Sequence, residues 1–356
     1  MGNAATGHAT SGSAADEGVA AGRLPPGVAV RVAAIDCGTN TIRLLIAEGV
    51  PGDGIWKEIH RETRTVRLGE GVDATGALTT SALDRAWSTL AHYASVVRAS
   101  EVLDLRVAAT SALRDTRNPE AFVALVRSVL GTGVDILTGD QEAVIGFRGT
   151  VAALAPGPGR VVTVDIGGGS TEIVLGRPPV VDAAGRPAAG VVEAAVSLDI
   201  GAVRLTERML AGDPPSAPEI ERARGHCAAT ISSAMRNWPA SLLAGVDTVI
   251  AVAGTALTVA AGAQRRSRLD PAQRDGAVLP YPDVHRTCAN LVHANRSHRA
   301  MLGYVLPGRV DVIGGGALVL SEVLRELERR VPVRELTISV ADILDGLVLS
   351  VFDRVS

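Results

Sequence analysis

Two stretches of the chain share one pattern of hydrophobic and polar positions. In residues 161–176, VVTVDIGGGSTEIVLG, an apolar run ends at Asp165, three glycines and three polar residues follow, and an apolar run resumes. In residues 32–47, VAAIDCGTNTIRLLIA, an apolar run ends at Asp36, and small polar residues precede a second apolar run. Each pattern predicts two β-strands joined by a glycine-containing turn.

The two stretches align without a gap. The alignment pairs aspartates, glycines, hydroxyl residues and one oppositely charged couple: Asp36 with Asp165, Gly38 with Gly167, Thr41 with Ser170, and Arg43 with Glu172. Each predicted hairpin opens one half of the chain. We therefore expect a duplicated domain with a ligand held between the two copies.

Strands and helices alternate along the rest of the chain. A short strand is predicted within residues 63–71. Apolar positions at helical spacing from Leu83 to Val97, Trp87 among them, predict a buried helix face whose N-cap is Thr80. Residues 336–339 predict the last strand, and Ser339 is expected to cap the final helix. The alternation predicts an α/β fold built as two halves around a cleft.

The predicted elements divide the chain into segments. Residues 1–29 are rich in Ala, Gly and Ser and are expected to form a disordered tail. A first domain is expected over residues 30–145 and a second over residues 146–339. A C-terminal helix within residues 340–356 is expected to return to the first domain. With 47% hydrophobic residues, the 356-residue chain can fill two cores.

Charge and composition narrow the possible partners. The net charge of −3 does not indicate nucleic-acid binding, and no apolar run reaches the roughly 18 residues expected of a membrane span. Lys57 is the only lysine, so arginines would have to hold a polyanionic ligand. Three widely separated cysteines, Cys37, Cys227 and Cys288, are typical of a reduced, cytoplasmic protein.

The predicted turns suggest a chemistry. Consecutive glycines let backbone N–H groups converge on a phosphate, and an aspartate at the strand end can hold a divalent cation through water. Glu142 lies in the first turn of a predicted helix just before the second hairpin. An acid there can simply complement the helix dipole, but this one would lie where the two halves meet. The strand–glycine–helix junction at Gly254 and Thr255 is a further candidate phosphate contact.

Seven blocks, in order, resemble the exopolyphosphatase and guanosine pentaphosphate phosphohydrolase (Ppx/GppA) family: DCGTNTIRLLIAE, ATSALRDTRN, TGDQEA, VDIGGGSTEIVLG, SLDIGAVRLTERML, AGTALTVAAG and GRVDVIGGGALVL. The resemblance spans residues 30–353. It implies duplicated actin-like domains flanking an interdomain cleft, within the sugar kinase, Hsp70 and actin superfamily. The chain resembles the short form of the family, which lacks a C-terminal HD-type helical domain.

The resemblance also implies roles for individual residues. Glu142 matches the general base, Arg114 a phosphate-facing arginine, and Asp165 and Glu172 the carboxylates that bind Mg²⁺ or another divalent cation, with Asp36 as a further candidate ligand. The residues expected to bind phosphate are Gly38, Thr39, Asn40, Arg43, Arg67, Gly167, Gly168, Gly169, Ser170, Thr171, Arg204, Gly254, Thr255 and Arg309. The chain departs from the family pattern at Gln141, where a glutamate is common, at Cys37, and at residues 313–316, where a proline-containing version is more usual.

The implied activity is hydrolysis of terminal phosphoanhydride bonds of inorganic polyphosphate, with short chains favoured. The nearest alternative is the same reaction on guanosine pentaphosphate. A kinase of the same superfamily would use residues 253–262 to bind adenosine, and Gln141 leaves room for a weakly catalytic sensor of nucleotide or polyphosphate. No nucleic-acid or membrane partner is expected, and the resemblance implies that a homodimer can form.

Overall fold

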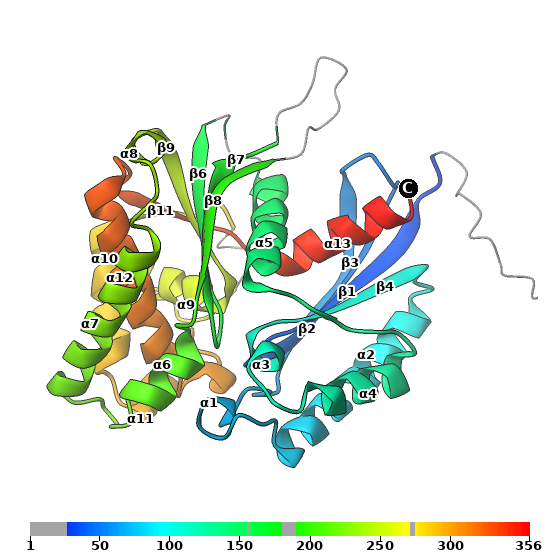
Figure 1. Ribbon diagram of the computed structural model, residues 1–356, viewed down its shortest axis with the longest axis horizontal. Coiled ribbons are helices and arrows are strands. Elements are labelled where there is room, and N and C mark those ends of the chain that lie inside the picture. Colours follow the sequence, from blue (N-terminus) through cyan, green and yellow to red (C-terminus); the bar gives the residue numbers. More distant parts are fainter. Residues whose placement is uncertain (1–26, 155–156, 158, 180–189, 271–274) are drawn as a thin grey trace, which may run out of the picture.

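A computed structural model describes residues 27–154, 157, 159–179, 190–270 and 275–356, and it consists of two α/β lobes (Figure 1). The predicted tail lies outside the described residues, apart from its last three positions. The first lobe contains β1 (Val30–Cys37), β2 (Thr41–Gly49), β3 (Trp56–Thr65), α1 (Val72–Thr75), α2 (Thr80–Ala99), β4 (Asp104–Ala109), α3 (Ser111–Arg114), α4 (Pro119–Leu130), β5 (Asp135–Ile136) and the C-terminal α13 (Ile343–Arg354).

The second lobe contains the remaining elements. They are α5 (Gly139–Leu154), β6 (Arg160–Ile166), β7 (Thr171–Arg177), β8 (Val191–Leu198), α6 (Ala202–Met209), α7 (Ala217–Ala234), α8 (Ala240–Leu243), β9 (Val246–Val252), α9 (Ala253–Ala263), β10 (Val278–Pro280), α10 (Tyr281–His293), α11 (Arg296–Met301), the 3₁₀ turn η1 (Pro307–Arg309), α12 (Ile313–Arg330) and β11 (Glu335–Ile338).

The two sheets have the same topology. Within the described residues, the first sheet runs β3-β2-β1-β4-β5, and the second runs β8-β7-β6-β9-β11 with β10 added at its edge. In each, an antiparallel three-stranded meander is followed by two parallel strands. This repetition confirms the duplicated α/β fold that the paired hairpins predicted.

Helices cover both faces of the central strands, so most positions of β1, β2, β6, β7 and β9 are buried, whereas β3, β5 and β8 at the sheet edges have at most one buried position each. On β1, Ala33 and Ile35 face the core under α2 and α4, whereas Val32 and Ala34 face α13. In the second lobe, α5 covers one face and α7, α10 and α12 cover the other. Burial on both faces explains why these strands read as nearly continuous apolar runs.

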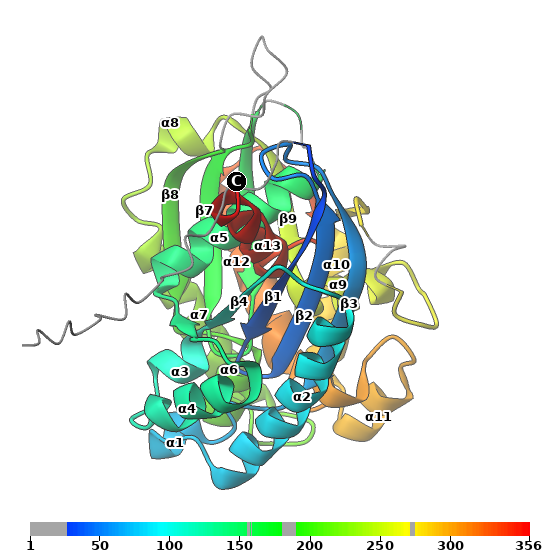
Figure 2. The same cartoon turned by 90° about the vertical axis from the view of Figure 1, so that its right-hand side faces the viewer.

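Helices α5 and α13 lie side by side between the two sheets (Figures 1 and 2). The expected boundary between residues 145 and 146 falls inside α5, which is one continuous helix that packs on the second sheet. Helix α13 packs on β1, β2 and β4 of the first lobe. The pair therefore connects the two lobes.

Several expected boundaries and caps differ from the structure. Strand β3 begins at Trp56, before the predicted segment, because it pairs along the whole of β2. The N-cap of α2 is Thr79 rather than Thr80, since the Thr79 side chain accepts the Ala82 N–H (3.2 Å). Trp87 is 56% exposed and lies off the buried face of that helix. Asp342, not Ser339, caps α13.

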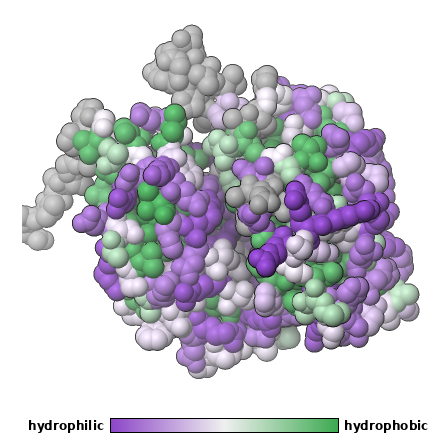
Figure 3. Space-filling model, turned by 180° about the vertical axis from the view of Figure 1, so that it is seen from behind, coloured by the Kyte–Doolittle hydropathy of each residue, from purple (hydrophilic) through white to green (hydrophobic). Residues whose placement is uncertain are grey.

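The surface between the lobes is polar (Figure 3), and the cysteines lie in the interior. Seen from behind, hydrophilic residues gather where the two lobes meet (Figure 3). All three cysteines are free and buried. In the part of the chain that the structure describes, no helix has the length and apolar character needed to span a membrane.

Candidate active site

The two predicted turns have the same local structure and meet in one cavity between the lobes. In the first turn the Gly38 N–H donates to the Thr41 carbonyl (3.0 Å), and in the second the Gly167 N–H donates to the Ser170 carbonyl (3.0 Å). Strand pairing sets Asp36 opposite Arg43, and Asp165 opposite Glu172. Each aspartate therefore lies at a strand end directly before its turn.

The turns touch each other, which requires glycine in the second one. A Cβ on Gly168 would lie 2.9 Å from the Thr39 Cβ, and a Cβ on Gly169 would lie 2.6 Å from the Ser111 Oγ. Thr39 and Ser111 also share a hydrogen bond (2.8 Å). The described structure is therefore a closed arrangement of the two lobes around the cavity.

Most of the expected site residues line this cavity. The lining consists of Asp36, Gly38, Thr39, Asn40, Thr41, Arg43, Thr110, Ser111, Glu142, Asp165, Ile166, Gly167, Gly168, Ser170, Ala202, Val203, Ala253, Gly254, Arg309, Val312 and Ile343. Within the described residues, the amide N–H groups of Thr39, Asn40 and Gly168, which line the cavity, have no backbone hydrogen-bond partner. These groups are free to donate to an anion.

Glu142 enters the cavity from the first turn of α5. Gln141 and Thr138 cap this helix reciprocally: the Thr138 N–H donates to the Gln141 Oε1 (2.9 Å), and the Gln141 N–H donates to the Thr138 Oγ1 (3.2 Å). The side chain of Gln141 is thus engaged in the cap. Burial raises the pKa of Glu142 to about 7, although the neighbouring Arg114 opposes this shift. A carboxylate with such a pKa can exchange protons near neutral pH.

Arg114 contacts Glu142 rather than lining the cavity. Its Nη1 donates both to the Glu142 Oε2 (2.7 Å) and to the Leu137 carbonyl (2.8 Å). Both side chains are largely buried, at 20% and 12% exposure respectively. The expectation of a phosphate-facing arginine therefore does not match this geometry, in which Arg114 orients the Glu142 carboxylate.

A cluster of carboxylates lies at and beside the cavity: Asp36 and Glu172 are buried, and Asp165 is partly buried. Burial, reinforced by Asp342 and Glu142, raises the pKa of Asp165 to about 8. Burial and the charges of Glu142 and Asp165 raise the pKa of Glu172 well above its usual range. Burial also raises the pKa of Asp36. Such mutual repulsion favours either bound protons or a bound cation.

These carboxylates fit a magnesium ion bound through few protein ligands. Asp36 and Asp165 both line the cavity, and the Asp36 Oδ1 is buried without a hydrogen-bond partner. Glu172 does not line the cavity, and the Ser197 hydroxyl donates to its Oε1 (2.7 Å). No group of three or more metal-binding side chains is preassembled in the described part of the chain. Magnesium commonly uses one or two carboxylates plus water and substrate phosphates, so the absence of a full cage does not conflict with this fit.

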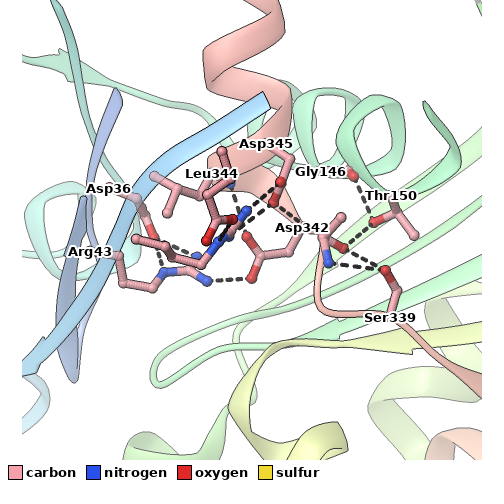
Figure 4. A network of polar contacts seen from close by, with 11 residues as sticks. Asp36, Arg43, Gly146, Thr150, Ser339, Asp342, Leu344 and Asp345 are labelled. Atoms are coloured by element: carbon pink, nitrogen blue, oxygen red, sulfur yellow. Dashed lines mark hydrogen bonds and ion pairs between the residues drawn. The ribbon is translucent and has the colours of Figure 1, made fainter. Parts of the chain in front are cut away.

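Two arginines line the cavity in different states. Arg43 is fully engaged, since it bonds to Asp36 and Asp342 (Figure 4). Arg309 is partly exposed and packs against Gly254, where a Cβ would overlap its guanidinium. Burial and the nearby Arg43 lower the pKa of Arg309 to about 10. Within the described residues its guanidinium has no hydrogen bond or ion pair, although the charges of Asp165 and Asp342 favour its protonated form, so its N–H groups are available to an anion.

Other expected phosphate ligands lie outside the cavity lining. Arg67 pairs with Asp311 (2.9 Å), and Arg204 pairs with Asp115 while its Nε donates to the Gly169 carbonyl (2.8 Å). Thr171 is fully buried and donates to the Ile200 carbonyl (2.6 Å). Thr255 is likewise fully buried, and Gly169 faces Ser111 and Thr39.

Sequence reasoning missed several residues at the cavity. Thr110 and Ser111 line the cavity and lie in the ATSALRDTRN block, but small hydroxyl residues are too common in sequences to signal a site by themselves. Ala253 lines the cavity with a φ of 62°, a left-handed conformation that is uncommon for a non-glycine residue and that concentrates at functional sites. Asp342, which holds Arg43, follows the predicted last strand and gave no signal of its own because its partner is 299 positions away.

Comparison with known proteins identifies the family to which this chain is similar. The model of the Ppx/GppA phosphatase family matches residues 45–354. Exopolyphosphatase 2 of Mycobacterium tuberculosis is 43% identical over 327 residues, which cover 90% of this chain and 98% of that protein. A guanosine-5'-triphosphate,3'-diphosphate pyrophosphatase of Vibrio atlanticus is 34% identical over 145 residues, 41% of this chain and 29% of that protein. The crystal structure of an exopolyphosphatase-like protein superposes with a TM-score of 0.84 at 34% identity, covering 92% of this chain and 98% of that one.

Proposed function

The chain belongs to the Ppx/GppA phosphatase family and is a phosphoanhydride hydrolase, and from this premise we propose that it releases orthophosphate from the ends of short inorganic polyphosphate chains. The observation that carries the proposal is the composition of one cavity. Two glycine turns with free N–H groups and the unpaired Arg309 surround the carboxylate of Glu142. This combination supplies hydrogen-bond donors for the phosphate oxygens, positive charge and a base. These are the requirements of phosphoryl transfer to water.

Each residue has a role in the proposed reaction. Glu142 accepts a proton from the attacking water, while Arg114 holds its carboxylate toward the cavity. The N–H groups of both turns and the guanidinium of Arg309 bind the phosphoryl oxygens. They stabilise the negative charge on these oxygens in the substrate and in the transition state. Asp36 and Asp165 would hold Mg²⁺, which supplies neutralisation of phosphate charge when it is bound.

Two features favour short polyphosphate over guanosine pentaphosphate. Among the residues that the structure describes, the cavity lining contains no aromatic side chain on which a base could stack. Relatives that align with 84–90% of the chain are named exopolyphosphatases, whereas the match to the guanosine enzyme covers 41% of the chain. As for chain length, the ion pairs Arg67–Asp311 and Arg204–Asp115 join the two lobes, and such closure favours a short chain over a long one as substrate.

The proposal is tested by orthophosphate release from tripolyphosphate, long polyphosphate and guanosine pentaphosphate, each with Mg²⁺. We expect the highest kcat/KM with tripolyphosphate. Glu142→Gln should reduce kcat by about 10²- to 10⁴-fold, since the amide cannot accept the proton of water. Glu120→Gln is the matched control, because Glu120 is an exposed first-turn acid of α4. Full turnover by folded Glu142→Gln would refute the role of Glu142, and binding without turnover by the wild type would indicate a sensor.

A further inference from the structure

We propose that Asp342 is a positioning residue for this reaction. It holds Arg43, and through Arg43 it holds Asp36 and the first phosphate turn at a fixed place relative to Glu142. The proposal rests on the hydrolase function described above. It assigns to a helix-capping residue a role in turnover that its position in the sequence does not suggest.

Arg43 bridges two buried carboxylates. Its Nε and Nη2 donate to the Asp36 Oδ2 (3.0 and 2.7 Å), and its Nη1 donates to the Asp342 Oδ2 (Figure 4). The side chains of Asp36 and Asp342 are 5% and 3% exposed. Since all three guanidinium nitrogens are engaged, Arg43 serves here as a bridge, whereas Arg309 keeps its charge free for the substrate.

The two carboxylate oxygens of Asp342 have separate tasks. Oδ1 accepts the Leu344 N–H (3.0 Å) and caps α13, while Oδ2 binds Arg43. The Asp342 N–H donates to the Asp345 Oδ2 (2.9 Å), and Asp345 is bound by Arg61 of β3 (2.6 Å). The start of α13 is therefore fixed to both β2 and β3. Because Asp342 lies at this start, its ion pair with Arg43 sets the position of the Arg43 guanidinium.

The same segment is pressed against the helix that carries Glu142. The Thr150 hydroxyl of α5 donates to the Ala341 carbonyl (3.2 Å), and a Cβ on Gly149 would overlap the Asp342 carbonyl. Glu142 and Asp36 thus belong to different lobes but are linked by one path: α5, the start of α13, Asp342, Arg43 and Asp36. Loss of the Asp342 contact would let the first turn shift relative to the base.

The test compares wild type with Asp342→Asn, Arg43→Gln and the double variant, using tripolyphosphate with Mg²⁺. Asparagine is a good N-cap but lacks the charge that holds Arg43. We expect Asp342→Asn to lower kcat on the order of 10-fold or more, because misplacement by about 1 Å can cost 10²-fold. The double variant should turn over no more slowly than Arg43→Gln alone, since Asp342 acts through Arg43.

Controls separate positioning from helix capping. Ser216→Ala removes the N-cap of α7, far from the cavity, and should leave kcat within about twofold despite a lower thermal midpoint. Asp342→Ser, which also caps but is too short to reach Arg43, should behave like Asp342→Asn and serves if the latter does not fold. Wild-type kcat in a folded Asp342 variant would overturn the proposal, as would additive losses in the double variant.

A readout without turnover separates this proposal from the function it rests on. Urea unfolding of the same four proteins should give a non-additive change in midpoint, because Arg43→Gln leaves the buried Asp342 without its cationic partner, while Asp342→Asn leaves Arg43 with one carboxylate in place of two. If the wild type releases no orthophosphate, the proposed function fails while this coupling can persist. If the coupling is absent, Asp342 does not hold Arg43 and the positioning role fails even in an active enzyme.

Discussion

Glu142 and Arg114 form the smallest unit on which the chemistry depends. Glu142 is buried among other carboxylates, which favours its protonated form, whereas the Arg114 guanidinium 2.7 Å away favours the ionised form. These opposing effects bring its pKa to about 7. A base with a much higher pKa would be protonated at neutral pH, and one with a much lower pKa would accept a proton poorly.

This balance predicts the effect of Arg114→Met on the pH dependence of turnover. Glu142 acts only as a carboxylate, so kcat should rise as pH increases through about 7 in the wild type. Because Arg114 lowers the pKa of Glu142, its replacement by an uncharged side chain of similar length should move the midpoint of this rise to higher pH. The measurement is kcat for tripolyphosphate across pH 5 to about 9.

Arg117→Met is the matched control for this experiment. Arg117 lies in the same segment, but its guanidinium contacts the Thr75 carbonyl (2.6 Å) and not Glu142. Its replacement should leave the midpoint unchanged. A midpoint that stays in place or moves to lower pH in Arg114→Met would show that Arg114 does not set the ionisation of the base.

At the scale of elements, the crossing of α5 and α13 depends on two glycines. A Cβ on Gly149 would overlap the Asp342 carbonyl and the Gly346 N–H, and a Cβ on Gly346 would overlap the Ile145 carbonyl. Gly149→Ala should therefore force the helices apart and lower the free energy of unfolding by about 1–3 kcal/mol. It should also lower kcat, because α5 carries Glu142.

Urea unfolding checks this prediction against a helical glycine that has room. At Gly225 in α7, an added Cβ would meet no atom of the described residues within 4 Å. Gly225→Ala should raise the free energy of unfolding by roughly 0.5–1 kcal/mol, since alanine loses less backbone entropy in a helix. Equal stabilisation by both alanines would mean that the crossing tolerates a methyl group.

The hairpins could be predicted from the sequence, whereas the helix crossing and the cap of α13 could not. The hairpins were predictable because strand alternation, the aspartate and the glycine turn are all local. The glycines of the crossing were not, since Gly149 and Gly346 lie almost 200 positions apart. The cap of α13 was assigned to Ser339, whose hydroxyl instead accepts the Ala341 N–H (3.0 Å) in a local turn.

For the whole molecule, the duplication was predictable but the contacts that close it were not. Matching blocks indicated two equivalent halves and a cleft between them. Arg67 and Arg204 were expected to hold phosphate, yet they pair with Asp311 and Asp115 of the opposite lobe. Nothing in the local pattern distinguishes an arginine that meets an anionic ligand from one that meets a distant aspartate.

These ion pairs lie on the side of the cavity away from the α5–α13 crossing and hold the lobes together there. Asp73 of α1 forms an ion pair with Arg208, and its Oδ1 lies 3.5 Å from the Nη1 of Arg204. Both arginines belong to α6. Asp73→Asn should weaken this closure and increase the radius of gyration measured by small-angle X-ray scattering. High salt should produce a similar increase in the wild type, because partly exposed charge pairs are screened.

Asp104→Asn is the control for closure, since Asp104 pairs with Arg354 inside the first lobe (2.9 Å). It should leave the radius of gyration unchanged. If closure limits entry of the substrate, Asp73→Asn should also lower KM for polyphosphate chains longer than tripolyphosphate, with less effect on tripolyphosphate itself. An unchanged radius in Asp73→Asn at both low and high salt would mean that α6 does not hold the lobes closed, and that the α5–α13 crossing alone fixes their arrangement.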